Sequence, residues 1–365
     1  MHAFLSHDSA CEALRALEEP RPCWPPEPRK LPLGGDCVSN QRGFRALAKT
    51  VDLASHGVLT HPVDLLVPSP AMRSRGKSAR LHVWSGLVPT NSMLRLGESL
   101  LLSGPELVIA QMCGSQAKLY ALLDRHAKAV REEREALGML GIDADPVVDN
   151  PLARDSIERL VAAVVLACEF AGTYRLGVGE GKTTYRRPPL MSAESLNRTI
   201  GDLHGTANVT RAAEVADLFY EQSASPMETA LALMLTLPVN LGGLGLPRAE
   251  LNAAVDVSQW RGTLTDRNTV EPDLLWRARR VAIEYDSAEF HELLGARQLE
   301  EDARRANILT ACGYRVLRVT PGVVRSARDV ELLGRQVAHL LGVELAQPSE
   351  VQGLRRTRLF SMLMR

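Results

Sequence analysis

The segment EPDLLWRARRVAIEYDSAEFHE, at residues 271–292, restricts the fold of this chain more than any other stretch. Two apolar runs are separated by the polar sequence RARR, and this pattern is typical of a β-hairpin. The same hairpin carries four chemically active side chains, Asp273, Glu284, Asp286 and His291. Carboxylates on strands that look buried need an explanation, because buried charges are normally paired or bound to a metal.

The elements around the hairpin predict a mixed α/β domain over residues 211–345. The sequence SPMETALALMLTLP predicts a short helix, with Ser225 at its start and Glu228 in its first turn. LNAAVDVSQW predicts a further strand, and ARQLEEDARRANILTACG predicts a helix that ends at Gly313. YRVLRVT and SARDVELLGRQVAHLLG predict a last strand and a last helix. This order describes a mixed sheet flanked by helices.

The earlier residues, 1–210, predict an α+β region with a mostly helical middle section. A helix is expected after Ser6, with Ser6 or Asp8 as its N-cap. VDLLVPS, LHVWSG and LRLGESLLLSG predict strands, and a long helical stretch begins at Pro105. Residues 346–365 are expected to form a separate tail with a basic cluster.

Composition excludes several classes of protein. Lysine and arginine number 43 and aspartate and glutamate also 43, so no strong overall field attracts the chain to nucleic acid or membrane. The six cysteines form no CxxC pair, which argues against zinc ribbons and disulfide frameworks. No signal peptide and no membrane-spanning segment is evident. We therefore expect a cytoplasmic protein without a membrane partner.

The spacing of the carboxylates predicts a cation site. Side chains alternate between the faces of a strand, so Glu284 and Asp286 project to one side. A turn at the RARR sequence brings Asp273, on the first strand, next to Glu284. Carboxylates this close raise each other's pKa unless a cation lies between them. Oxygen ligands of this kind are those that Mg²⁺ prefers.

A simpler interpretation remains open at this point. Acidic residues are common on the exposed face of an edge strand, where Arg277, Arg279 and Arg280 would neutralise them. His291 taken alone is as compatible with a surface or helix-cap position as with a catalytic base.

The run PDLLW…AIEYDS…FH…D..R.N.L...GYRVLRVT resembles endonuclease-like domains related to very-short-patch mismatch-repair nucleases. These domains belong to the PD-(D/E)xK restriction-endonuclease superfamily, and the upstream SPMET is similar to the same group. The resemblance covers about residues 223–343 and implies a restriction-endonuclease-like mixed sheet flanked by helices.

The resemblance also implies roles for individual residues. Asp273 corresponds to the aspartate of the PD element, Glu284 to the second acidic residue, and Glu228 to a helix-borne acid that completes a site for Mg²⁺ or Mn²⁺. Asp286, a further candidate ligand, stands where the superfamily usually has a lysine that orients or deprotonates the attacking water. His291 is then the candidate base, or a stabiliser of the leaving group.

The first half resembles, more weakly, the β-rich module of abortive-infection antitoxin-type regulators. The resemblance rests on a strand, a basic turn, an HV strand and the helix start SGPEL. Unlike those regulators, the chain has no clear helix-turn-helix at its start. The basic turn is expected either to contact phosphate or to be a solvated loop, and its cations are Arg73, Arg75, Lys77 and Arg80.

Three functions follow as hypotheses. The first is a metal-dependent nuclease that hydrolyses DNA phosphodiester bonds in phage or mobile-element defence, with a toxin or another defence protein as partner. Its phosphate contacts would come from Arg304, Arg305, Arg315 and Arg318, although Arg305 equally suits an ion pair with Asp302 on the same helix. The alternative is a nucleic-acid-binding, antitoxin-like regulator whose nuclease fold is catalytically inactive. A structural or protein-interaction role is the third, and no residue pattern favours it.

Overall fold

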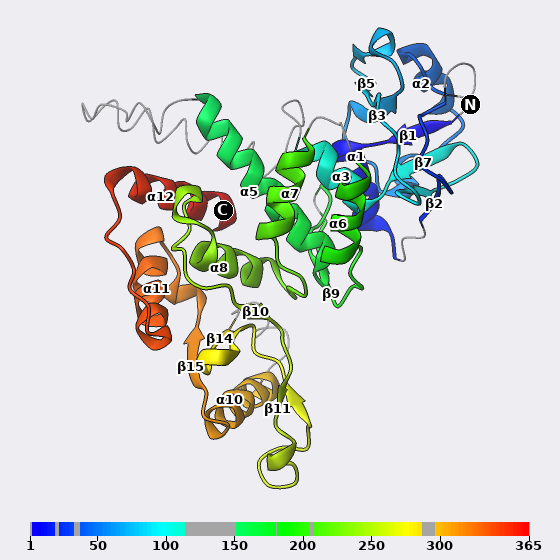
Figure 1. Cartoon of the computed structure of the whole chain (residues 1–365). Helices are drawn as coiled ribbons and strands as arrows, with labels where there is room; N and C mark the ends of the chain where they lie inside the picture. The colour runs from blue at the N-terminus through cyan, green and yellow to red at the C-terminus, as the bar shows by residue number, and fades with distance from the viewer. Residues whose placement is uncertain are drawn as a thin grey trace. The chain divides into compact units, whose positions relative to one another are not determined.

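The structure is a computed structural model of the whole chain (Figure 1). It describes residues 2–18, 22–32, 37–113, 151–179, 181–203, 208–286 and 296–364, with only the backbone considered at 22–23, 151–156 and 296–303. Two compact units are present: unit 1 comprises Met1–Ala121 and Glu158–Glu221, and unit 2 comprises Leu122–Ile157 and Gln222–Arg365. Both contain helices and mixed sheets, so the predicted mixed α/β class is confirmed.

Unit 1 is built on a seven-stranded mixed sheet in the order β2-β6-β7-β1-β3-β5-β4. Its strands are β1 (Ala3–Leu5), β2 (Pro22–Trp24), β3 (Val63–Val67), β4 (Ser74–Arg75), β5 (Ala79–Val83), β6 (Met93–Arg95) and β7 (Leu100–Ser103). Strand β1 pairs parallel with β7 and antiparallel with β3, and β3 pairs parallel with β5. The predicted strands VDLLVPS and LHVWSG are therefore confirmed, whereas LRLGESLLLSG contributes to two antiparallel strands, β6 and β7. Strands β1 and β3 are buried along their whole length, which explains their continuous apolar sequences.

Helices accompany this sheet in the described part of unit 1, and α1 packs directly on it. They are α1 (His7–Ala16), α2 (Gln41–Leu47), α3 (Pro105–Met112), α5 (Pro151–Ala171), α6 (Ala193–Asp202) and α7 (Val209–Leu218), beside a small pair of strands, β8 (Tyr174–Arg175) and β9 (Thr184–Tyr185). Helix α1 packs on β3 and β7, α3 packs on α1, and α6 and α7 pack on α3. Ser6 holds the N-cap position of α1 as predicted, although its side chain makes no capping hydrogen bond. The rest of the long helical stretch predicted from Pro105 falls at 114–140, outside the described residues.

The segment CEFAGTYRL, residues 168–176, joins α5 to β8 through buried polar contacts. Arg15 on α1 donates to both carboxylate oxygens of Glu169, each at 2.7 Å, and Leu176 N donates to Glu169 Oε1 at 3.0 Å. Arg175 is fully buried, and burial lowers its pKa to about 10. Its guanidinium donates to the carbonyls of Glu169, Gly172, Tyr174 and Pro188. The segment thus stabilises unit 1 by satisfying backbone carbonyls that would otherwise be buried without donors.

Unit 2 is built on a four-stranded sheet in the order β10-β13-β14-β15. Its strands are β10 (Glu250–Leu251), β13 (Leu274–Trp276), β14 (Val281–Tyr285) and β15 (Arg315–Val319). β13 and β14 form the predicted hairpin, and β15 adds to β14 in parallel orientation. Parallel pairing requires a crossover, which contains helix α10 (Ala296–Ala311).

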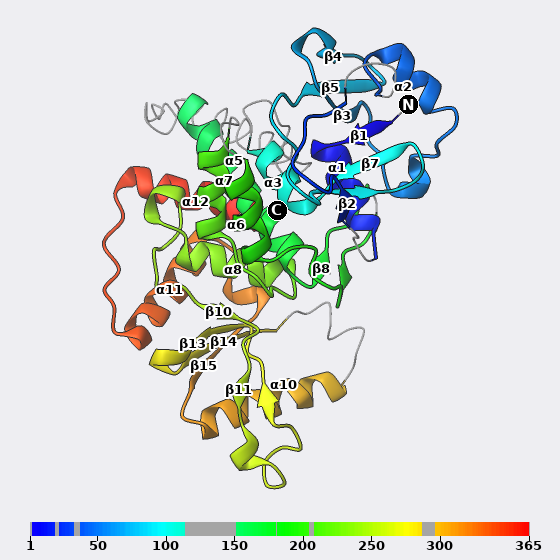
Figure 2. The same ribbon diagram turned by 45° about the vertical axis from the view of Figure 1, so that its right-hand side comes forward.

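Figure 2 shows α10 on one side of these strands and α11 (Ala327–Leu341) on the other. On the first side, Ile308 and Leu309 of α10 pack with Leu275 and Ala282, together with valines of the hairpin β11 (Val255–Asp256) and β12 (Thr269–Val270). On the second side, α11 contacts β14 and the buried helix α8 (Pro226–Thr236). The sheet is therefore apolar on both faces.

Two predicted elements of unit 2 differ from the structure. LNAAVDVSQW is not one strand, because it supplies β10's last residue, then β11 in a different sheet, then a 3₁₀ turn at Ser258–Trp260. The segment expected as a separate tail contains helix α12 (Glu350–Met364), which packs on α8, and Arg356 of its basic cluster is 3.2 Å from Glu331. None of the described helices is both long and apolar enough to cross a bilayer.

Candidate functional site

The hairpin register brings the first two carboxylates together. Leu274 pairs with Ile283 and Leu275 with Ala282, so the next position of this antiparallel ladder sets Asp273 opposite Glu284. Both side chains lie on the face of the sheet that packs against α10, next to the apolar cluster between the sheet and this helix. Both are buried. The predicted proximity of these two residues follows from a turn short enough to keep the strands in register.

A third carboxylate comes from α8. Glu228 is buried in the first turn of that helix, and its backbone N–H donates to the side chain of Ser225, the N-cap residue. Its Oε2 accepts hydrogen bonds from Ala224 N at 2.8 Å and from Asn252 Nδ2 at 2.7 Å. Burial still raises the pKa of Glu228, because these hydrogen bonds offset only part of the lost hydration.

Asp273 is the most strongly perturbed of the three. Burial raises its pKa well above the usual value, and repulsion from Glu228 and Glu284 raises it further. A hydrogen bond from Tyr285 N to Oδ2 acts in the opposite direction. The three carboxylates therefore lie close enough to repel one another, although they come from α8, β14 and the residue before β13.

Arg305, from α10, forms an ion pair with this group. Its Nη2 is 2.6 Å from Oε2 of Glu284, and its charge also favours the ionised forms of Glu228 and Asp273. Neutralisation by the arginines of the hairpin turn is not what is seen: Arg277 instead donates to the exposed Glu250. The guanidinium of Arg305 thus faces a group of three buried carboxylates.

Asp286 lies on the same side of the sheet but in a separate ion pair. Its N–H continues the ladder by donating to Val319 O at 2.8 Å, and its Oδ2 is 2.6 Å from Nη2 of Arg318. Arg315 lies at the other end of β15 and donates to the carbonyls of Arg279 and Leu340. Of the two predicted phosphate contacts on this strand, Arg318 is thus engaged by Asp286, and Arg315 lies away from the carboxylates.

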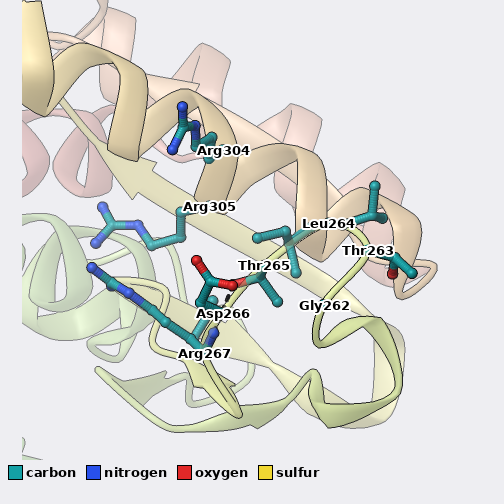
Figure 3. Close-up of a pocket in the computed structure, with 10 residues that line it drawn as sticks. Gly262, Thr263, Leu264, Thr265, Asp266, Arg267, Arg304 and Arg305 are labelled. Atoms are coloured by element: carbon teal, nitrogen blue, oxygen red, sulfur yellow. Dashed lines mark hydrogen bonds between the residues drawn. The ribbon is translucent and has the colours of Figure 1, made fainter.

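A cleft of about 470 Å³ opens beside Arg305 (Figure 3). One wall is α10, with Arg304, Arg305 and Ile308, and the other is the loop between β11 and β12, residues 262–267. Figure 3 shows the side chains of Arg267 and Arg305 extending in the same direction from the two walls. The cleft therefore combines arginines from both sides at the edge of the carboxylate group.

The donor chemistry of this group suits a hard divalent cation. Mg²⁺ and Mn²⁺ take carboxylate oxygens, and a divalent charge would offset the repulsion that raises the pKa of Asp273. As placed, however, no three or more His, Cys, Asp or Glu side chains of the described residues surround one point closely enough to hold a metal. Arg305 supplies the positive charge in this arrangement.

Several site residues were not found from sequence, or lie outside the described part. His291 falls within residues 287–295 and the side chain of Asp302 within 296–303, so neither is described. Arg267 and Asn252 were missed, because a polar loop and an isolated amide carry no periodic signal. The direct contact of Arg305 with Glu284 also depends on α10 crossing the end of β14, which no local pattern specifies.

Unit 1 contains the basic turn predicted to contact phosphate or solvent. Arg73 follows a 3₁₀ turn, Arg75 is on β4, and Lys77 lies between β4 and β5. Arg80 differs from these three, because its guanidinium is 3.1 Å from the buried carboxylate of Asp64. Arg80 is thus anchored inside unit 1.

Replacing Asp273 with asparagine is expected to stabilise the metal-free protein. In the unfolded chain the carboxyl of Asp273 loses its proton near the pKa of a free aspartate, about 4, whereas in the folded chain its raised pKa keeps it protonated to higher pH. The free energy of unfolding therefore declines as pH rises above about 4. Asparagine removes this penalty, and its amide oxygen can still accept from Tyr285 N. We expect an increase in Tm of about 2–5 °C at neutral pH, shrinking as pH falls to about 4. A variant less stable than the wild type at neutral pH in EDTA would contradict this.

The site therefore combines a group of buried carboxylates with a cleft lined by arginines, both in unit 2. Comparison with protein-family models, with curated proteins and with solved structures found no match to this chain.

Proposed function

We propose that unit 2 is a nuclease module that uses Mg²⁺ or Mn²⁺ to hydrolyse phosphodiester bonds in DNA. The observation that carries this proposal is the group Glu228, Asp273 and Glu284, three buried carboxylates from separate elements that lie beside Arg305. Such a group costs stability, because each buried charge loses hydration and repels its neighbours. A ligand site for a cation is a functional reason to retain that cost.

The chemistry divides between the carboxylates and the cleft. A divalent cation bound here would lower the pKa of a water molecule and stabilise the charge that develops on the phosphate. Glu228, Asp273 and Glu284 would hold it, and Asp286 lies further along the same face. The cleft beside them would bind phosphate, because Arg267, Arg304 and Arg305 line it and guanidinium groups can donate to phosphate oxygens without reading the bases.

The sequence motif supports the same proposal from another direction. The order of PDLLW, AIEYDS and GYRVLRVT resembles the PD-(D/E)xK superfamily, and a mixed four-stranded sheet between helices is compatible with a restriction-endonuclease-like fold. A role in phage or mobile-element defence, with a toxin or another defence protein as partner, extends this resemblance.

The second candidate function is a nucleic-acid-binding regulator that does not cut. One observation favours it: Asp286, at the position usually held by the superfamily's lysine, is ion-paired with Arg318 and offers no ammonium group to a water molecule. The Arg305–Glu284 ion pair would then be a permanent structural contact, and the cleft arginines would bind DNA without turnover.

Cleavage assays separate the two functions. Wild-type protein is incubated in Mg²⁺, in Mn²⁺ or in EDTA with four substrates. These are supercoiled plasmid, linear duplex DNA, single-stranded DNA and an RNA of the same sequence. We expect metal-dependent cutting that Asp273→Asn reduces at least about a hundredfold. Glu250→Gln is the matched control, because it neutralises an exposed carboxylate of the same unit. DNA binding without cutting under all metal conditions would establish the regulator instead.

A further inference from the structure

The loop that forms one wall of the cleft in unit 2, residues 262–267, is held in a fixed shape by its own hydrogen bonds (Figure 3). Trp260 O accepts from Leu264 N at 3.0 Å. Gly262 N donates to Thr265 O at 2.8 Å, and Gly262 has a φ of 78°, which glycine adopts without strain. Side chains on this loop are therefore presented to the cleft in a set arrangement, which lowers the entropy cost of binding.

Three apolar side chains line the cleft from both of its walls. Val270 of β12 and Ile308 of α10 are buried and belong to the apolar cluster between that helix and the strands. Leu264 lies on the loop and is 50% exposed. One exposed leucine is common on a protein surface. Because Leu264 shares the cleft with two further apolar side chains, a ligand bound there would cover apolar surface on the loop and on the helix.

The charged side chains that line the cleft are three arginines and one carboxylate. Arg304 and Arg305 come from α10, and Arg267 and Asp266 come from the loop. Arg305 also forms the ion pair with Glu284, so the cleft begins one side chain away from the carboxylate group. Even with Glu284 included, the guanidinium groups outnumber the carboxylates at the cleft, which favours a ligand that carries a phosphate.

A phosphate group alone does not match this lining. Phosphate is strongly hydrated, so it gains nothing from apolar side chains, and Asp266 repels it. A nucleobase matches the remaining residues, because its faces pack on apolar side chains and its Watson–Crick edge offers N–H donors to a carboxylate. The volume of about 470 Å³ lies within the range of pockets that hold small organic ligands.

A base in a continuous duplex is not available to such a cleft. Neighbouring bases cover both of its faces, and its pairing partner occupies its Watson–Crick edge. Taking the base out of the duplex costs its stacking and its pairing, whereas a single strand already exposes its bases. The apolar part of the cleft therefore favours unpaired nucleotides.

We propose that this cleft holds an unpaired nucleotide of DNA, with the base against Leu264 and Ile308 and the phosphate on Arg267. The substrate class of the module is then single-stranded or locally unpaired DNA, and not continuous duplex. This inference rests on the nuclease function proposed for unit 2. Asp266 accepts from the edge of the base, and the pair of Arg305 with Glu284 sets the nucleotide beside the carboxylate group.

The test measures DNA binding by the full chain in EDTA, where metal-dependent cutting cannot occur. Fluorescence anisotropy compares a labelled single strand with the duplex of the same sequence. We expect the single strand to bind about tenfold tighter. Leu264→Ser should weaken single-strand binding about five- to tenfold and leave duplex binding unchanged, because it removes apolar contact and no charge. The matched control is Leu332→Ser, a leucine of α11 that is 51% exposed, and it should bind both DNAs as the wild type does.

The salt dependence of the variants gives a second readout. The deficit of Leu264→Ser should persist as salt is raised, since apolar contact is not screened. The deficit of Arg267→Gln should shrink under the same conditions, because a phosphate contact weakens with salt in the wild type as well. A Leu264→Ser deficit that disappears with salt would contradict contact with a base.

Two results would overturn the inference. One is equal affinity of the wild type for the single strand and the duplex, and the other is wild-type binding of the single strand by a folded Leu264→Ser protein. The nuclease function is judged separately by cutting in Mg²⁺ or Mn²⁺. Preference for the single strand without any cutting would retain the nucleotide site and reject the nuclease. Cutting of linear duplex by a protein with no such preference would retain the nuclease and reject the site.

Discussion

Replacing Glu284 with glutamine is expected to remove DNA cleavage and to destabilise unit 2 by about 3 kcal/mol. Its side chain is almost fully buried, and the carboxylate is 2.6 Å from Nη2 of Arg305. Glutamine keeps the shape but not the charge, so the guanidinium loses its closest counter-ion inside the protein. The effect on stability is opposite to that expected for Asp273→Asn, because burial, and then repulsion from Glu228 and Glu284, disfavour the charged form of Asp273.

Urea unfolding in EDTA measures this stability, with plasmid cleavage in Mn²⁺ as the second readout. Glu250→Gln is again the control, because its pair with Arg277 is about half exposed and contributes little. A double-mutant cycle with Arg305→Met isolates the pair: the double variant should be more stable than Glu284→Gln alone. Unchanged stability in Glu284→Gln would contradict the ion pair, and unchanged cleavage would contradict its role as a metal ligand.

Replacing Glu169 with alanine is expected to destabilise unit 1 by about 3–5 kcal/mol. The substitution leaves the buried guanidinium of Arg15 without its bidentate partner and Leu176 N without its acceptor. It also removes the ion pair that links α1 to the end of α5. A loss of this size is a large fraction of the stability of a typical domain.

Chemical denaturation followed by circular dichroism checks this result. Glu194→Ala is the matched control, because Glu194 pairs with Arg198 one helical turn away on an exposed surface. We expect that control to unfold at the same urea concentration as the wild type. Equal unfolding midpoints for Glu169→Ala and Glu194→Ala would show that the buried pair contributes no net stability.

Local sequence patterns were sufficient for most elements of unit 2. The hairpin β13–β14, helix α10 with Gly313 after it, and helix α11 with Gly342 after it occur where periodicity and turn residues predict them. LNAAVDVSQW was misjudged because its short apolar runs pair with different partners, and pairing is a long-range property. The helical end of the chain was missed because its basic cluster obscured an apolar face that packs on α8.

The sequence by itself determined that Asp273 and Glu284 would be neighbours, since alternation along strands and a short turn leave one register for the hairpin. Only the tertiary structure decided which charges meet them. Glu228 lies on a helix that precedes the hairpin, and Arg305 lies on a helix that follows it. Their contacts with the hairpin are set by the packing of these helices, not by local propensity. The same reason applies in unit 1, where His7 and His82 are 75 residues apart in the chain yet stack at 3.9 Å because α1 packs against the sheet.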